Sequence, residues 1–246
     1  LGPAGALPRG SVIGMGSNDL SLELLAEQYQ QLHPDTRILV NDVGSLPGLM
    51  ALGRGEAHFA ASHLYDPESG DYNIPILRRL FPQQSFALVT LASRAQGLIV
   101  AAGNPKRIKA VKDLARRSVR YTNRQRGSGT RALLDDLLRR ARVAPADVRG
   151  YEREERTHAA VAAAVAQGST DAGLGIMAAA QAFGLGFVPL CSERFELVLP
   201  LGHSLVAQLV RAIKRPEFQR AVSALGGYVM AHAGQLRMLS GKTRNI

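Results

Sequence analysis

The sequence predicts an α/β fold made of two Rossmann-like lobes that are joined by two crossings of the chain. Short apolar runs alternate along the 246 residues with stretches of helical periodicity, the order expected of a mainly parallel sheet. The strand–turn–helix pattern at the start of the chain begins again near Ser118. Hydrophobic residues make up 46% of the chain, which is enough for a substantial core.

The first lobe is expected to begin with an apolar strand and a helix that carries leucines on one face. His33-Pro34 ends that helix, because the residue before a proline avoids the helical region. The expected elements are a strand at 11–15, a helix at 20–32, a strand at 37–43, a short helix at 46–52, a strand at 58–61, a loop at 62–76, and strands at 85–91 and 97–101.

The second lobe repeats the same order of elements before the chain returns. The expected elements are a strand at 118–122, a loop at 123–129, helices at 130–142 and 157–167, a strand at 171–175, a helix to 183, strands at 187–190 and 196–199, and helices over most of 205–230. The chain is expected to leave the first lobe near 91–94 and to re-enter it near 190–194. We therefore assign residues 1–91 plus 193–246 to lobe I and residues 92–192 to lobe II.

Several functional classes are disfavoured by composition. No apolar run approaches the roughly 18 to 20 residues of a membrane-spanning helix, so no membrane partner is expected. The single cysteine, Cys191, excludes an internal disulfide framework and a cysteine-based zinc site. The six histidines are scattered, with no pair four residues apart, so we expect neither a metal site nor a cofactor.

The positive charge is concentrated in one segment. Thirteen basic and three acidic residues lie between Lys106 and Arg142, so this segment alone carries +10, the net charge of the whole chain. Such a segment indicates an acidic ligand, an anionic partner or nucleic acid, and it is equally typical of a solvated arginine-rich surface. Only Tyr121 is available there for base stacking, and no helix-turn-helix or zinc-finger pattern is present.

Three turns share a design that suits anions. Gly16-Ser17-Asn18, Gly44-Ser45 and the segment 126–130 each follow an expected strand and precede an expected helix. A helix start presents unpaired N–H groups and a partial positive charge, and hydroxyl side chains add further donors. Plain helix capping explains any one of these turns equally well. Three together favour an anion-binding site.

No pattern for catalysis is convincing. Two short glycine patterns, at 14–19 and 173–178, resemble dinucleotide fingerprints only weakly, and no phosphate-binding P-loop motif exists. Ser128 lies in R-G-S-G-T and so is not a nucleophile elbow. His63 and Asp66 are the acid–base candidates if the chain is an enzyme. We expect a binding protein with no catalytic residues.

Four segments resemble the periplasmic-binding-protein-like domain family. They are G-S-N-D at 16–19, D-V-G-S-L-x-G-L-x-A-L-x-x-G-E-A-H at 42–58, N-R-Q-R-G-S-G-T-R at 123–131 and D-A-G-L-G-I at 171–176. More narrowly, they are similar to cytoplasmic substrate-binding domains fused to helix-turn-helix regulators or to molybdopterin-biosynthesis proteins. Molybdate receptors are related, and LysR-type effector domains share the fold more distantly.

The resemblance implies a ligand held in a cleft between the lobes by hydroxyls and backbone amides, with hinge closure on binding. Carried over to this chain, it predicts a ligand site whose donors come from both lobes and an acidic residue near the cleft or hinge. The predicted ligand-binding residues are Ser17, Asn18, Ser45, His63, Tyr65, Arg124, Arg126, Gly127, Ser128, Gly129, Thr130 and Asp171.

The chain departs from molybdate receptors at Arg124 and Arg126, and His63 with Tyr65 follows the third strand. Those arginines suit a larger ligand, such as a molybdopterin-type cofactor or a nucleotide, so the ligand stays open between this class and molybdate, tungstate or a related oxyanion. Leu1 to Gly10 show no initiating Met and no leader pattern. We therefore expect a cytoplasmic sensor with a further domain upstream, such as a helix-turn-helix DNA-binding domain, as its regulatory partner.

Overall fold

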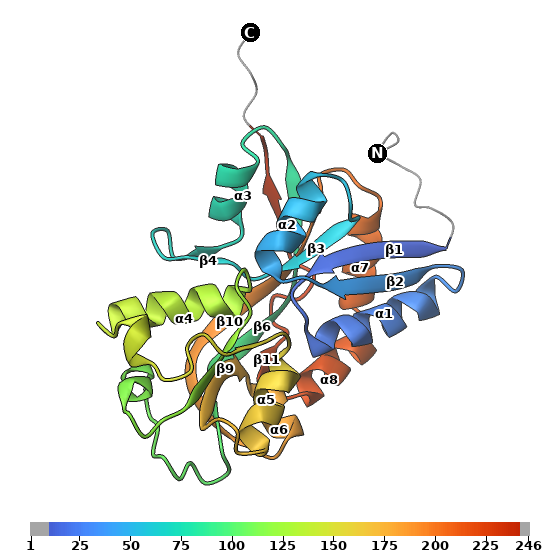
Figure 1. The fold of residues 1–246 in the computed structure, drawn as a ribbon. Helices are drawn as coiled ribbons and strands as arrows, with labels where there is room; N and C mark the ends of the chain where they lie inside the picture. Colours follow the sequence, from blue (N-terminus) through green and yellow to red (C-terminus); the bar gives the residue numbers. More distant parts are fainter. Residues whose placement is uncertain (1–9, 242–246) are drawn as a thin grey trace. The chain divides into compact units, whose positions relative to one another are not determined.

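The computed structural model of the protein describes residues 10–241 and confirms the α/β class (Figure 1). The expectation about the start of the chain, and the assignment of 1–9 and 242–246 to lobe I, concern segments outside the described residues. The described chain divides into two compact units. Unit 1 holds residues 10–93, 194–225 and 229–241, and unit 2 holds residues 94–193 with 226–228.

Unit 1 is built on three parallel strands in the order β2-β1-β3, with β10 antiparallel beside β3. The helix that follows β1 contacts β2, α7 and α8, whereas α2 packs on β1 and β3. The elements of this unit are β1 Ser11–Gly16, α1 Leu20–Leu32, β2 Arg37–Asp42, α2 Ser45–Gly53, β3 Phe59–Ser62, β4 Tyr65–Asp66, β5 Asp71–Tyr72, α3 Ile74–Leu80, α7 Leu205–Ile213, α8 Pro216–Ala224 and β12 Leu236–Leu239.

Unit 2 contains a second sheet segment, in the order β6-β9-β7-β8, with β7 parallel to both β9 and β8. Its elements are the 3-10 turns Val111–Ala115 and Pro145–Asp147, β7 Tyr121–Arg124, α4 Gly129–Arg140, β8 Glu154–Glu155, α5 His158–Ala166, β9 Ala172–Ile176 and α6 Met177–Ala182. Two long strands, β6 Phe86–Val100 and β10 Gly186–Pro200, carry residues of both units, and β11 Tyr228–Val229 pairs with β6.

Each unit has its own hydrophobic core, as the alternation of apolar runs predicts. In unit 1 the core joins α2, α3 and the first half of β6 through Leu49, Leu77 and Leu88. In unit 2 it joins β6, β7 and α4 through Leu98, Tyr121 and Leu134. No described helix has both the length and the apolar character needed to cross a membrane.

Several segments differ from the elements expected for them. Residues 62–76 were expected to be a loop, but they form the β4–β5 hairpin and the start of α3. The strand pairs expected at 85–91 with 97–101, and at 187–190 with 196–199, are single strands, β6 and β10. Arg94 and Glu193 interrupt the two apolar runs, yet they pair with each other at the centre of these strands. The strands at 228–229 and 236–239 were not anticipated.

Candidate functional site

Three of the predicted ligand-binding residues converge in unit 1. Ser17 follows β1, Ser45 opens α2 and His63 follows β3, and all three side chains are buried. The Ser17 and Ser45 hydroxyl oxygens lie 2.8 Å apart. The His63 ring nitrogen Nε2 lies 3.2 Å from Ser17 Oγ, and the His63 backbone N–H donates to Ser45 Oγ at 3.3 Å. The arrangement brings two hydroxyls and an imidazole together at the carboxyl ends of parallel strands, where α/β folds bind ligands.

Two glycines allow α2 to approach β1 this closely. Gly16 has a φ of 147°, and a Cβ there would meet the Ala61 carbonyl oxygen at 2.1 Å. Gly48 lies in α2, and a Cβ on it would meet Gly16 Cα at 2.6 Å. Because both glycines lack side chains, the start of α2 sits directly against the end of β1. That contact is what places Ser45 beside Ser17.

The start of α2 differs from an ordinary capped helix. Its N-cap residue is Gly44, with a φ of 88° and no side-chain capping bond. Ser45 is the first helical residue, so its hydroxyl does not cap the helix. Within the described part of the chain the backbone N–H groups of Ser45 and Leu46 have no hydrogen-bond partner, and Pro47 has no N–H. Unpaired donors at a helix start attract an anion.

Capping explains the other two helix starts. The Asp19 carboxylate accepts hydrogen bonds from the backbone N–H and the hydroxyl of Ser21, so α1 already has a negative group at its N-terminus. In unit 2, Ser128 is the N-cap of α4, and its Oγ accepts from the Arg131 backbone N–H at 3.2 Å. Of the three glycine-containing turns, only Gly44-Ser45 therefore departs from simple capping.

The remaining predicted residues of unit 1 lie in different surroundings. Asn18 lines a small cavity of about 170 Å³ together with Asp19, Glu23 and Asp42. The negative charges of these acidic residues make the cavity unfavourable for an anion. The Tyr65 ring lies 5.3 Å from that of Tyr72 across the β4–β5 hairpin.

Asp66, one of the two acid–base candidates of the enzyme alternative, is hydrogen-bonded by two neighbouring side chains. Its carboxylate accepts from the Ser69 hydroxyl at 2.7 Å and from the Arg79 guanidinium at 2.6 Å. These bonds lower the pKa of Asp66 below its ordinary value, so at neutral pH it is an ionised carboxylate. The residue is therefore poorly suited to act as a general acid.

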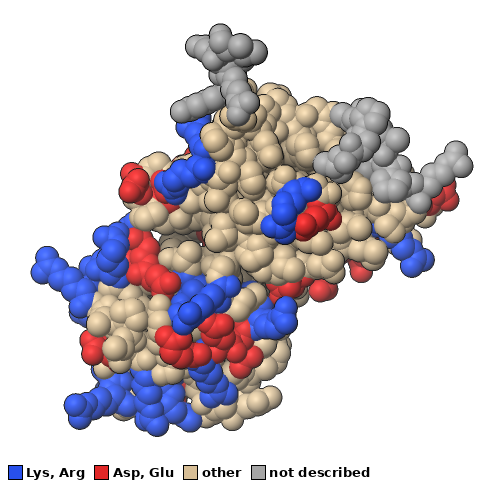
Figure 2. Space-filling view, turned by 45° about the horizontal axis from the view of Figure 1, so that its top comes forward, with Lys and Arg blue, Asp and Glu red and all other residues tan. Residues whose placement is uncertain are grey.

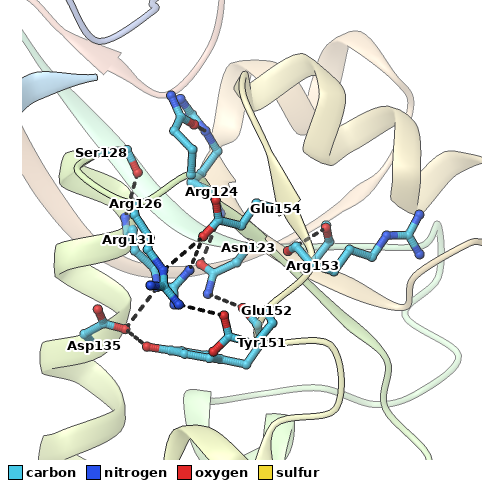
Figure 3. A network of polar contacts seen from close by, with 12 residues as sticks. Asn123, Arg124, Arg126, Ser128, Arg131, Asp135, Tyr151, Glu152, Arg153 and Glu154 are labelled. Carbon is cyan, nitrogen blue, oxygen red and sulfur yellow. Dashed lines mark hydrogen bonds and ion pairs between the residues drawn. The ribbon is translucent and has the colours of Figure 1, made fainter. Parts of the chain in front are cut away.

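The predicted residues of unit 2 other than Asp171 cluster around the turn from β7 into α4 (Figure 3). Gly127 has a φ of 83°, which turns the chain into the helix, and Gly129 and Thr130 are its first two residues. The buried Thr130 hydroxyl accepts from Gln96 at 3.2 Å. This turn offers a second set of backbone and hydroxyl donors, within unit 2.

The two arginines of this turn are engaged by protein groups, and their expected role as anion-binding charges stays a prediction. Arg126 is exposed and donates to Glu152 at 2.9 Å, with Glu154 at 3.7 Å. The buried Arg124 donates to the Gln125 side chain at 3.1 Å and to the Arg156 carbonyl at 2.7 Å. Figure 3 shows the acidic side chains turned toward Arg126. Since the glutamates come from the segment entering β8, sequence spacing gave no sign of these pairs.

Asp171 does not lie with the other predicted residues of unit 2. It precedes β9, and its carboxylate accepts from the backbone N–H of Arg120 at 2.8 Å and from the Arg120 guanidinium at 3.0 Å. Because β7 and β9 are parallel, this pair sits where both strands begin, whereas Ser128 follows the end of β7. Within unit 2 Asp171 therefore lies apart from the turn that holds Ser128, and its expected place near the cleft or hinge stays a prediction. The Arg120 contacts lower the pKa of Asp171.

The basic segment is partly neutralised. Asp136 forms ion pairs with Arg139 and Arg140 at 2.6 and 2.7 Å, and Asp171 pairs with Arg120. Figure 2 shows the Lys and Arg side chains interspersed with Asp and Glu in the lower half of the view. Contact of this segment with duplex DNA stays a prediction, and binding that weakens steeply with added salt would test it.

A buried polar cluster was missed by sequence reasoning. Glu193 accepts from Arg94 at 2.5 Å and from Gln96 at 2.8 Å, and all three side chains are buried in the long strands β10 and β6. Gln96 also donates to Thr130, so the cluster reaches the start of α4. The sequence signal for this cluster is a charged residue in the middle of each of two otherwise apolar stretches, Arg94 in 86–100 and Glu193 in 186–200.

Comparison with known protein families identifies the chain's relatives. The profile of the PBP superfamily domain matches residues 26–214, more than three quarters of the sequence. The chain belongs to the PBP superfamily. Among curated proteins, the uncharacterized protein YvgK of Bacillus subtilis is 35% identical over 223 residues, which cover 90% of this chain and 72% of YvgK.

Solved structures share the PBP fold at low sequence identity. A putative phosphate ABC transporter substrate-binding protein with bound phosphate from Clostridium perfringens has a TM-score of 0.66 at 17% identity, covering 89% of this chain and 98% of that one. The tungstate ABC transporter structure from Geobacter sulfurreducens has a TM-score of 0.63 at 14% identity, covering 87% and 98%. The LysR family transcriptional regulator CbnR has a TM-score of 0.54 at 16% identity, covering 84% and 69%.

Proposed function

We propose that this PBP domain is a non-enzymatic binding domain that captures a small tetrahedral oxyanion, of the molybdate or tungstate class. The observation that carries the proposal is the start of α2, where the Ser45 hydroxyl does not cap the helix and lies 2.8 Å from the Ser17 hydroxyl. Two hydroxyls beside two unpaired backbone N–H groups form a donor set without a carboxylate among its members. Phosphate and tungstate in the names of fold relatives support an anion as ligand.

The larger phosphorylated ligand is the weaker candidate. It was motivated by Arg124 and Arg126, and Arg126 forms ion pairs with Glu152 and Glu154. An enzyme in the same site would need an acid or base: Asp66 is bonded to Ser69 and Arg79, and His63, the other candidate, is tested by asking whether turnover of a phosphorylated substrate is lost in His63→Ala. A non-enzymatic role is therefore the better supported proposal.

The test is a thermal-shift panel with molybdate, tungstate, sulfate, phosphate and organic phosphates. A ligand at 100 times its dissociation constant adds about 2.7 kcal/mol of stability, which raises the melting temperature measurably. Ser17→Ala and Ser45→Ala should each reduce affinity by roughly ten- to hundredfold, since each removes a hydrogen bond to a charged group of about 1.5–3 kcal/mol. Ser118→Ala, at an exposed serine, is the matched control and should leave the affinity unchanged.

Ser128→Ala measures what the donors at the start of α4 contribute. If no member of the panel raises the melting temperature, the oxyanion proposal fails. A shift produced only by the organic phosphates would replace it with the larger-ligand alternative. Unchanged affinity in both Ser17→Ala and Ser45→Ala would refute the assignment of the site to α2.

We propose further that anion binding is the signal for an attached or partner regulatory module. The support is the similarity in fold to a LysR family regulator. Binding would bias such a module through different affinities for two conformational states. Anion-dependent DNA binding by the full-length protein would test this role, and the cytoplasmic location stays a prediction that cell fractionation would test.

A further inference from the structure

His63 contacts both hydroxyls of the candidate site through two different groups. Its ring nitrogen Nε2 lies 3.2 Å from Ser17 Oγ, and its backbone N–H donates to Ser45 Oγ at 3.3 Å. The three side chains are between 0% and 2% exposed, so bulk water does not compete for these contacts. Which group donates in the hydrogen bonds between the Ser17 hydroxyl, the Ser45 hydroxyl and the His63 ring therefore depends on the protons that these three side chains carry.

The proton count distinguishes two states of the cluster. A serine hydroxyl has one proton to donate, whereas a neutral imidazole nitrogen is either a donor or an acceptor. If Nε2 is an acceptor, Ser17 donates its proton to His63 and Ser45 donates to Ser17, so both hydroxyl protons are used within the cluster. If Nε2 carries a proton, it donates to Ser17 Oγ, and at least one hydroxyl proton remains for a ligand.

We propose that His63 carries a proton on Nε2 when an anion is bound, and that this makes the site selective for fully deprotonated oxyanions. In that state His63 donates to both hydroxyl oxygens, so Ser17 and Ser45 both turn their protons toward the ligand. The hydrogen bond between the two hydroxyls is given up in this state. The inference rests on the proposed oxyanion-binding function and adds its selectivity.

The selectivity follows from the proton carried by the ligand. Molybdate, tungstate and sulfate present only acceptor oxygens at neutral pH, whereas phosphate keeps at least one proton that needs an acceptor. His63 fills one of the two acceptor positions on each serine oxygen and leaves both hydroxyl protons for the ligand, so the cluster favours a ligand that only accepts hydrogen bonds. His63 is thus a positioning residue, which acts on the ligand through the two serines.

The experiment compares three variants by calorimetric titration with molybdate, sulfate and phosphate. His63→Leu keeps the backbone N–H and removes the ring donor, so the Kd for molybdate should rise at least tenfold. His63→Gln retains an N–H donor at a similar reach and should stay within about threefold of wild type. His232→Leu removes an exposed histidine and is the matched control. Melting temperatures of the ligand-free variants show whether each one folds.

A second readout measures the proton directly. Nitrogen-15 NMR of the histidine side chains should show Nε2 of His63 protonated in the anion-bound protein. An unprotonated Nε2 in that complex, wild-type affinity in folded His63→Leu, or a wild-type preference for phosphate would each overturn the inference and leave the oxyanion-binding function standing. Failure of wild type to bind any of the three anions would instead refute the proposed function, and the inference with it.

Discussion

The buried pair Arg94–Glu193 should dominate the stability of the strands in which it lies. The Arg94 Nε atom lies 2.5 Å from Glu193 Oε1, and the two side chains are 0% and 1% exposed. Removing one charge leaves the other buried without the opposite charge it pairs with, which costs about 3–5 kcal/mol. We therefore expect Arg94→Met and Glu193→Gln each to lower the free energy of unfolding by this amount.

The double variant separates charge pairing from packing. Once Arg94 is gone, the Glu193→Gln change no longer breaks the Arg94–Glu193 pair, so Arg94→Met/Glu193→Gln should cost less than the sum of the two single variants. The difference should be about 2 kcal/mol, within the range of roughly 0.5–3 kcal/mol for interaction energies between residues in direct contact. Urea unfolding followed by circular dichroism measures each value.

An exposed pair of the same chemistry provides the control. Arg54 Nε lies 2.7 Å from Glu56 Oε1, but their side chains are 56% and 49% exposed. Solvent screens such pairs, so Arg54→Met and Glu56→Gln should unfold at the wild-type urea concentration. The reasoning is refuted if the buried single variants are as stable as these exposed ones, or if the double variant costs the full sum.

Two further predictions concern titrating groups. The bonds to Arg120 lower the pKa of Asp171, so the ionised carboxylate stabilises the fold above the ordinary pKa of 3.8, and this stabilisation is lost as the pH falls below it. Asp171→Asn should therefore lower the melting temperature at pH 7, and the difference from wild type should disappear near pH 2. A difference that persists at pH 2 would contradict the assignment. Burial, with a smaller contribution from the charge of Glu193, raises the pKa of the Cys191 thiol to about 12. Iodoacetamide at pH 8 should therefore modify the native protein far more slowly than the urea-unfolded protein. Equal rates would show that the thiol is not shielded.

The elements with a clear periodic pattern were predictable from the sequence. The helix expected at 20–32 is α1 Leu20–Leu32, because its apolar positions recur on one face and His33-Pro34 ends it. The grouping of Ser17, Ser45 and His63 was also accessible, since each follows the end of a strand in a parallel sheet. These features depend on local chain chemistry and on the rules of α/β topology.

What the sequence determined by itself is the α/β class, the order of most elements and the hydroxyl residues at the helix starts. Only the tertiary structure decided which groups those residues face. Arg126 meets Glu152, and Arg94 meets Glu193 ninety-nine positions away. The physical reason is that a charged side chain looks the same in a sequence whether it awaits a ligand or pairs with another residue. The partner is set by strand pairing and register, which local periodicity does not encode.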